Sequence, residues 1–367
     1  MDKLCEPALE AEVLIERDRA VIQMLFNRPQ ALNALNDAMR AIMADIFTGF
    51  ARDPELYALV IRSTDLQSFC SGTDFIELSQ LARHSLDDGR ASLAKIYKLS
   101  WLAECFSKPT AVLIEGAIIG AGAGLMQSCT HRVAAETYEF SMPETSLGMF
   151  PDAGMARVLA GLPHQVGFYL ALTGRTIGRA DAYALGLVTH CIAGAEFENI
   201  ILELADAQPI DPLLDSRHEV LQTGELEAHY ACISDVFAAP TVSEVMSRLQ
   251  DQKAGYHAPE WIDGVIRDLS LRSPTALAIT HRHLQFCRGL GLRENLIRDY
   301  ALSCQLLEHK DFYAGIDARR TGENYEPDCE PASLPEIEDE VLARFFSRTH
   351  NAELELAGRA DMQPASG

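Results

Sequence analysis

The chain has 367 residues, of which 48% are hydrophobic, and its formal net charge is −22. This length and apolar content suffice for a large buried core, and they predict either one large domain with a smaller one or two domains. The strongly negative charge repels nucleic acid and anionic membrane surfaces, so neither is an expected partner.

The chain begins MDKLCEPALEAEVLIERD, which is acidic and lacks the apolar segment of a secretory signal or the basic character of a transit peptide. The nine cysteines are scattered without CxxC pairs, and several, such as Cys129 and Cys191, lie in apolar runs. This usage predicts reduced, mostly buried thiols in a cytoplasmic protein. No run approaches the roughly 18 apolar residues of a membrane-spanning helix.

Strands and helices alternate through the first half of the chain, which predicts an α/β layered body rather than a helical bundle or a β-sandwich. The recurring order is strand, strand, helix. The predicted elements are two strands over 11–26, a loop over 27–36, a helix over 36–52, a buried strand over 56–64, helices over 76–106, a strand over 110–116 and a strand over 131–144.

From Gly154 onward the pattern is mostly helical. The Pro- and Asp-rich stretch DAQPIDPLLD (206–215) predicts a linker. The predicted organisation is therefore a core over 1–205, a helical C-terminal region over 206–350 and a disordered tail over 351–367.

A glycine-rich stretch, GAIIGAGAGL (116–125), joins a predicted strand to a predicted helix. Its free N–H groups suit either the pyrophosphate of a dinucleotide or an oxyanion hole. Glu136 and Glu139 follow about 15 to 20 residues further on, where a ribose-binding acid would lie. The spacing GxGxG and the position in mid-chain oppose a dinucleotide site. Close packing of the helix on the strand is a third explanation of the small residues.

A second small-residue turn, FCSGTDF (69–75), follows the predicted strand 56–64. Gly72 permits a tight turn, so the N–H of Thr73 can face a cleft. Asp74 lies near the start of the next helix, where capping explains it as well as binding does. Two such turns together can supply two N–H donors to one oxygen atom.

Two acids occur in MPETSLGMFPDAG (142–154), namely Glu144 and Asp152. Two carboxylates that converge on one cleft can divide the work of acid–base catalysis. The alternatives are a solvated loop acid for Glu144 and an N-cap for Asp152. His281 and His283 form an H-x-H pair without an acid or cysteine at ligand spacing, so no metal site is expected.

Taken together, these motifs resemble the crotonase superfamily of acyl-CoA enzymes. NRPQALNALN (27–36) is similar to its first CoA-binding loop, and FCSGTDF and GAIIGAGAGL are similar to its two oxyanion loops. The resemblance implies a spiral of ββα units, an acyl-CoA bent into a cleft, and oxyanion donors at the N–H groups of Thr73 and Gly120. It places further contacts to substrate or coenzyme A at Arg28, Ala31, Leu32, Ser71, Gly72, Asp74 and Gly116.

Within the superfamily, the chain most resembles the 3-hydroxyisobutyryl-CoA hydrolases. Hydratases use two glutamates, and the position of the first is held here by Gly124, whereas Glu144 corresponds to the second. The MPET…FPD segment instead looks like the hydrolase motif in which a glutamate and an aspartate, here Glu144 and Asp152, are both catalytic. The segments 170–190, 273–280 and 309–318 extend the resemblance.

The sequence departs from the hydrolase pattern at Thr73, at Met155, at Asp317 and over 319–327. The implied activity is hydrolysis of a short 3-hydroxyacyl-CoA thioester, without a separate cofactor or metal, by a homo-oligomer such as a trimer or hexamer. Arg28, or Arg319 with Arg320, would neutralise the CoA phosphates against the negative net charge, unless these arginines are ordinary solvated surface. The competing functions are an enoyl-CoA hydratase, a dienoyl-CoA isomerase, a non-catalytic acyl-CoA-binding protein and a dinucleotide-dependent oxidoreductase.

Overall fold

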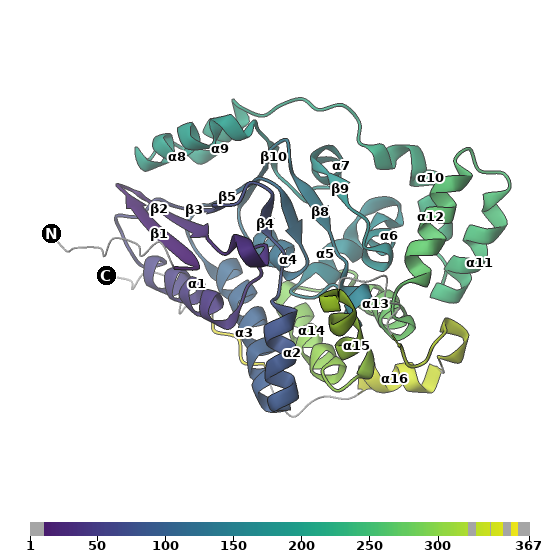
Figure 1. The fold of residues 1–367 in the computed structure, drawn as a ribbon. Coiled ribbons are helices and arrows are strands. Elements are labelled where there is room, and N and C mark those ends of the chain that lie inside the picture. The colour runs from purple at the N-terminus through teal and green to yellow at the C-terminus, as the bar shows by residue number, and fades with distance from the viewer. Residues whose placement is uncertain (1–10, 322–327, 338, 348–353, 359–367) are drawn as a thin grey trace.

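A computed structural model describes residues 11–321, 328–337, 339–347 and 354–358 (Figure 1). In these ranges the strands form a six-stranded sheet, ordered β1-β2-β3-β5-β7-β10, and a four-stranded sheet, ordered β4-β6-β8-β9. The antiparallel pairs are β1 with β2 and β8 with β9, and the other neighbours are parallel. The strands are β1 Val13–Asp18, β2 Val21–Phe26, β3 Ala58–Ser63, β4 Ser68–Cys70, β5 Thr110–Ile114, β6 Ala117–Ile119, β7 His131–Ala134, β8 Glu139–Ser141, β9 Ile177–Gly178 and β10 His190–Cys191.

Three strands of the larger sheet are each followed by a short strand of the smaller one. β3 leads to β4, β5 to β6 and β7 to β8, and each pair then enters a helical segment. The predicted fold class, an α/β spiral of ββα units with a mostly helical C-terminal region, is confirmed.

The helices begin and end close to the predicted positions in the first half of the chain. Asn36 caps the first helix by accepting a hydrogen bond from the Met39 N–H, and Ser85 caps the third in the same way through Asp88. The helices are α1 Asp37–Phe50, α2 Phe75–His84, α3 Leu86–Cys105, α4 Ala121–Gln127, α5 Met155–Gly161, α6 Val166–Thr173, α7 Arg179–Ala184, α8 Phe197–Ala205, α9 Ile210–Asp215, α10 Tyr230–Val236, α11 Val242–Lys253, α12 Pro259–Ser270, α13 Pro274–Cys287, α14 Leu292–Leu306, α15 Lys310–Thr321 and α16 Asp339–Ser347.

The central strands β3 and β5 are mostly apolar because helices cover both faces of the larger sheet. In β3, Leu59 and Ile61 join the main core beside α1 and α3, whereas Ala58 and Val60 pack in a second apolar layer beneath α8 and α9. This alternation is the two-residue period of a strand whose faces are both buried.

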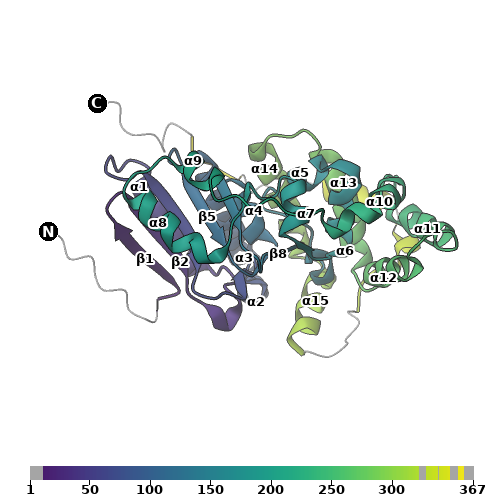
Figure 2. The ribbon, with the colours of Figure 1, turned by 90° about the horizontal axis from the view of Figure 1, so that it is seen from above.

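The C-terminal helices pack on the ββα core around its second sheet. α13 contacts α5, α14 contacts α3, and α15 contacts both α2 and the 3-10 turn η2 (Glu144–Leu147). Figures 1 and 2 show α11 and α12 at the end of the molecule opposite β1. Within the described ranges, none of the helices combines the length and the apolar character needed to cross a membrane.

Two expectations about secondary structure are wrong, and a third, the disordered tail, is wrong for residues 354–358. The predicted linker 206–215 contains α9, whose Ile210, Leu213 and Leu214 are buried against the sheet. The predicted strand 131–144 is two strands in two different sheets. In the predicted disordered tail, residues 354–358 are described, Leu354 is buried, and the Ala357 carbonyl accepts a hydrogen bond from the Trp101 indole. Residues 351–353 and 359–367 lie outside the described residues, and the domain boundary at 205 stays a prediction.

Candidate active site

A cavity of about 600 Å³ lies where the predicted motifs meet. Six segments form its wall: the loop after β2, the turn between β4 and α2, α2 itself, the end of β6, η2 with the residue before it, and one face of α15. Its lining residues are Arg28, Gln30, Ala31, Leu32, Ala34, Ser71, Thr73, Asp74, Phe75, Ile76, Glu77, Gln80, Ile119, Gly120, Pro143, Glu144, Leu147, Ile316, Arg319 and Arg320.

The turn between β4 and α2 is pressed against the turn between β6 and α4. Gly72 has φ +85°, and a Cβ atom added there would lie 2.8 Å from the Ile119 carbonyl oxygen and 3.1 Å from the Ala121 nitrogen. Only glycine permits this approach. The turn that carries Thr73 is therefore held beside the N-terminus of α4.

Asp74 caps α2 by accepting a hydrogen bond from the Glu77 N–H, so the capping explanation holds for this residue. Its other carboxylate oxygen pairs with the Arg28 guanidinium at 2.7 Å, and Arg28 also pairs with Glu12 at 2.9 Å. Arg28 lines the cavity, but two acids neutralise its charge. It fastens the first loop to the second turn, which makes it a weak candidate for binding the CoA phosphates.

The expected oxyanion donor at Gly120 is wrong, because its N–H donates to the Ser141 carbonyl at 3.2 Å as part of the sheet contact. The next amide belongs to Ala121, the first residue of α4, where a helix leaves its N–H groups without internal partners. Among the described residues, the N–H groups of Thr73 and Ala121 have no acceptor. The two free amides therefore lie on adjoining turns.

Glu144 is the first residue of η2, and only 2% of it is exposed. Its carboxylate faces Gly120, since a Cβ atom added at Gly120 would lie 2.7 Å from Glu144 Oε1. Neither carboxylate oxygen has a hydrogen-bond partner among the described residues. Burial, and after it the nearby negative charge of Asp152, raise the pKa of Glu144 to about 8, and Arg272 opposes the shift.

Asp152 is 1% exposed and lies close enough to Glu144 to affect its ionisation. The interpretation as an N-cap is wrong, because the N-cap of α5 is Gly154. Asp152 Oδ2 accepts a hydrogen bond from the Tyr97 hydroxyl at 2.9 Å, and Oδ1 has no partner among the described residues. Burial and the charge of Asp299 raise the pKa of Asp152 to about 7.

The other predicted binding residues separate into two groups. Ala31, Leu32 and Ser71 line the cavity, whereas Gly72 does not line it and packs against the turn between β6 and α4. Gly116 does not line the cavity: it has φ +74°, and a Cβ atom there would lie 2.3 Å from the Gln67 carbonyl, so its place is in a tight turn.

Sequence reasoning missed Ala121, Tyr97 and the apolar wall formed by Leu147 and Ile316. Nothing in the pattern of an amphipathic helix distinguishes Tyr97 from an ordinary core aromatic residue.

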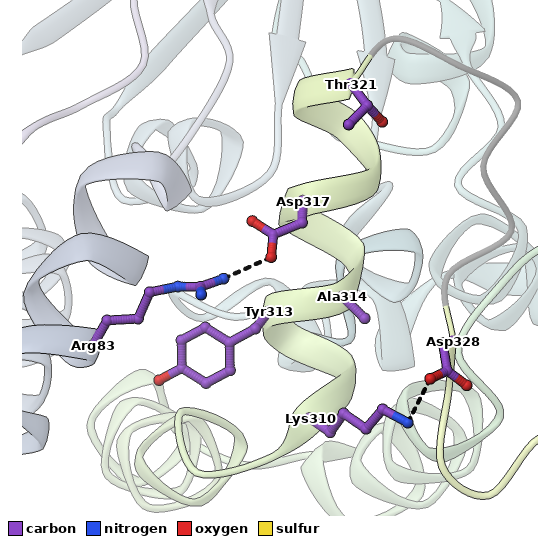
Figure 3. A pocket seen from close by; sticks show the side chains of 7 residues that line it. All are labelled: Arg83, Lys310, Tyr313, Ala314, Asp317, Thr321 and Asp328. Carbon is purple, nitrogen blue, oxygen red and sulfur yellow. Dashed lines mark hydrogen bonds and ion pairs between the residues drawn. The ribbon is translucent and has the colours of Figure 1, made fainter.

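A second, more open depression of about 730 Å³ lies on a different face of α15 (Figure 3). Its two cationic side chains are already paired: Arg83 contacts Asp317 at 2.8 Å, and Lys310 contacts Asp328 at 2.7 Å. Arg319 and Arg320, by contrast, line the main cavity and form no ion pair with any described residue. Of the two hollows, the main cavity is therefore the one that has arginines free of ion pairs with described residues, which can bind an anion.

The raised pKa of Glu144 predicts that the folded protein loses stability as pH rises. Between about 4.5 and 8 the folded chain keeps a proton that the unfolded chain has released, so the free energy of unfolding falls over this interval. One such group contributes a slope on the order of 1.4 kcal/mol per pH unit. Urea unfolding from pH 5 to 8.5 should show Glu144→Gln gaining stability relative to the wild type as pH rises. The exposed Glu340→Gln serves as control, and parallel curves for Glu144→Gln and the wild type would contradict the burial argument.

Comparisons with known proteins find matches over most of the chain. The sequence model of the family described as "Enoyl-CoA hydratase/isomerase" matches residues 21–346. The chain is 29% identical to 3-hydroxyisobutyryl-CoA hydrolase 1 of Arabidopsis thaliana, over 99% of this chain and 98% of that protein. It is 30% identical to the mitochondrial 3-hydroxyisobutyryl-CoA hydrolase of Rattus norvegicus, over 94% of this chain and 91% of that protein.

Solved structures show the same fold. An enoyl-CoA hydratase from Rhodobacter sphaeroides superposes with a TM-score of 0.84 at 28% identity, covering 92% of this chain and 97% of that one. A carnitinyl-CoA dehydratase from Mycobacterium thermoresistibile superposes with a TM-score of 0.87 at 24% identity, covering 95% of this chain and 99% of that one.

Proposed function

This chain belongs to the enoyl-CoA hydratase/isomerase family, also called the crotonase superfamily, and from that premise we propose that it hydrolyses the thioester of a short 3-hydroxyacyl-CoA. 3-Hydroxyisobutyryl-CoA is the first substrate to test, because relatives that match the chain over nearly its whole length are named for that activity. The observation that carries the proposal is the pair of buried acids, Glu144 and Asp152, beside two main-chain amides that have no acceptor among the described residues.

The site around Gly124 favours hydrolysis over hydration or isomerisation. The resemblance places an additional acid of the hydratases and dienoyl-CoA isomerases at or near this position. A Cβ atom at Gly124 would lie 2.6 Å from the Ala153 carbonyl oxygen, so the backbone leaves no room for a glutamate. Chemistry that needs a second acid on α4 is therefore disfavoured.

In the proposed mechanism the thioester carbonyl oxygen accepts hydrogen bonds from the N–H groups of Thr73 and Ala121. Such donors stabilise the negative charge that develops on the oxygen, and loss of one typically costs about 10²–10³ in rate. Ionised Glu144 either attacks the carbonyl carbon to form an anhydride or removes a proton from water. Both routes end with water added across the C–S bond, giving a carboxylic acid and the free thiol of coenzyme A. Asp152 would orient the 3-hydroxyl group and carry protons.

Binding of coenzyme A must overcome the net charge of −22. Arg319 and Arg320 are placed at the cavity to do so, since both line it and neither is paired with an acid among the described residues. The proposal needs no separate cofactor, because every reacting group belongs to the chain or to the substrate. A trimeric or hexameric assembly and a cytoplasmic location stay predictions.

The proposed activity predicts release of free thiol from short 3-hydroxyacyl-CoA esters. Thiol release should be measured with 3-hydroxyisobutyryl-CoA and 3-hydroxypropionyl-CoA, and loss of the enoyl absorbance should be followed with crotonyl-CoA. We expect thiol release from at least one hydroxyacyl ester, and little hydration. Rapid hydration of crotonyl-CoA without thiol release would instead favour a hydratase, and tight binding without turnover would favour a non-catalytic acyl-CoA-binding protein.

A further inference from the structure

The hydroxyl of Tyr97, on α3, contacts both the buried Asp152 and a serine of α14. Tyr97 is fully buried, and its hydroxyl donates to Asp152 Oδ2 at 2.9 Å. The same hydroxyl lies 2.7 Å from Ser303 Oγ. A phenol has one hydrogen, so when Tyr97 gives it to the carboxylate, Ser303 must donate in the second bond. The three groups form a short chain of hydrogen bonds within the core.

The loop that carries Asp152 is fixed independently by a second buried acid. Asp299 Oδ2 accepts a hydrogen bond from the Gly154 N–H at 2.9 Å. Asp299 Oδ1 contacts His283 Nε2 and accepts from Asn295 Nδ2, each at 2.7 Å. Asp299 and His283 are both buried. Helices α13 and α14 thus set the backbone position of the loop, but they leave the orientation of the Asp152 carboxylate to Tyr97.

We propose that Tyr97 is a positioning residue for Asp152, whose hydroxyl holds one carboxylate oxygen and so keeps the other available to the reacting groups. This inference rests on the proposed thioester hydrolysis and deepens it, because it assigns a role in the reaction to a residue outside the cavity wall. Oδ1 is the oxygen left over, since it has no partner among the described residues. A phenylalanine at position 97 would fill nearly the same space but leave Oδ2 buried without its donor.

The ionisation of Asp152 depends on the groups that surround it. Asp299 of α14 and burial raise its pKa, whereas Tyr97 of α3 and Arg40 of α1 lower it, and Glu144 of η2 lies close by. Removing the Tyr97 hydroxyl therefore raises the pKa of Asp152 further. A residue that only filled space would not produce this change.

The test compares Tyr97→Phe with Tyr300→Phe in the full chain. Tyr300 is a matched control, because it is buried, its ring packs edge-on against Tyr97 with centroids 6.1 Å apart, and its hydroxyl interacts with Cys304 rather than Asp152. We expect Tyr97→Phe to lower kcat about 10- to 100-fold with KM nearly unchanged, as misplacement of a reacting group does. Tyr300→Phe should stay within a few-fold of the wild type.

The dependence of kcat on pH separates the two roles, because it would not change if Tyr97 only filled space. In the profile of kcat against pH, the limb that is lost in Asp152→Asn reports the ionisation of Asp152. In Tyr97→Phe this limb should move to higher pH by about 0.5–1 unit, the size expected for one lost hydrogen bond. Ser303→Ala should move it in the same direction by less, and it keeps the test available if Tyr97→Phe fails to fold.

Two results would overturn the inference: an unmoved limb in both variants, or equal kcat losses in Tyr97→Phe and Tyr300→Phe. Failure of the proposed function looks different, because Glu144→Gln and Asp152→Asn would then leave thiol release intact, or the wild type would release none.

Discussion

Glu144→Gln should abolish nearly all thiol release, with a loss of ~10³-fold or more in kcat at pH 8. The glutamine has the same shape, and neither oxygen of the native carboxylate has a hydrogen-bond partner among the described residues, so few native contacts are lost. The change removes the only form of the side chain that can attack or accept a proton. Affinity for coenzyme A esters should persist, which isothermal titration can measure separately from turnover.

Glu139→Gln is the matched control for that experiment, because Glu139 is an exposed acid on β8, just before Glu144 in the chain. It should hydrolyse the substrate at nearly the wild-type rate. Full activity in Glu144→Gln would reject the assignment of Glu144. Loss of activity in the Glu139 variant would instead indicate that the acids after the glycine-rich stretch, Glu136 and Glu139, take part in the function.

Gly120→Ala adds a single methyl group to the cavity and should lower both stability and activity. The new Cβ would lie 2.7 Å from Glu144 Oε1, and Gly120 has φ +59° and ψ −137°, a conformation that only glycine adopts readily. We expect a loss of roughly 1–3 kcal/mol in the free energy of unfolding. We also expect a loss of about 10²-fold or more in kcat/KM, since Glu144 must move.

Gly49→Ala provides the comparison, because Gly49 is in α1 and a Cβ atom there meets nothing within 4 Å. That variant should be as stable as the wild type or slightly more stable, since alanine favours a helix. Urea unfolding and thiol release measured on both variants would separate the two effects. Near-normal turnover in Gly120→Ala would mean that the turn can relax without displacing the carboxylate.

The sequence predicted the parts of the site that depend on local order along the chain. Gly72, Thr73 and Glu144 lie in turns directly after strands, so the positions of the turns follow once the strands are identified. The family resemblance then predicted that these turns lie together at one site. The cavity at the junction of these turns agrees with that expectation.

The donor in the second turn was misassigned for a physical reason. Which amide is free depends on the register between β6 and β8, where Ile119 lies opposite Ser141 and the Gly120 N–H is consequently engaged. Register between strands is a long-range property that a glycine pattern does not encode. Tyr97 and Asp299 were missed for the same reason, since their contacts with the 151–154 loop join segments distant in sequence.

The last described stretch of the chain, residues 354–358, contacts the helix that carries Tyr97. The Ala357 carbonyl is bound by the Trp101 indole, and Trp101 is one helical turn along α3 from Tyr97. Leu354 buries its side chain in the same core. Residues 354–358 therefore brace α3 near Tyr97, and ending the chain before Leu354 would remove both contacts.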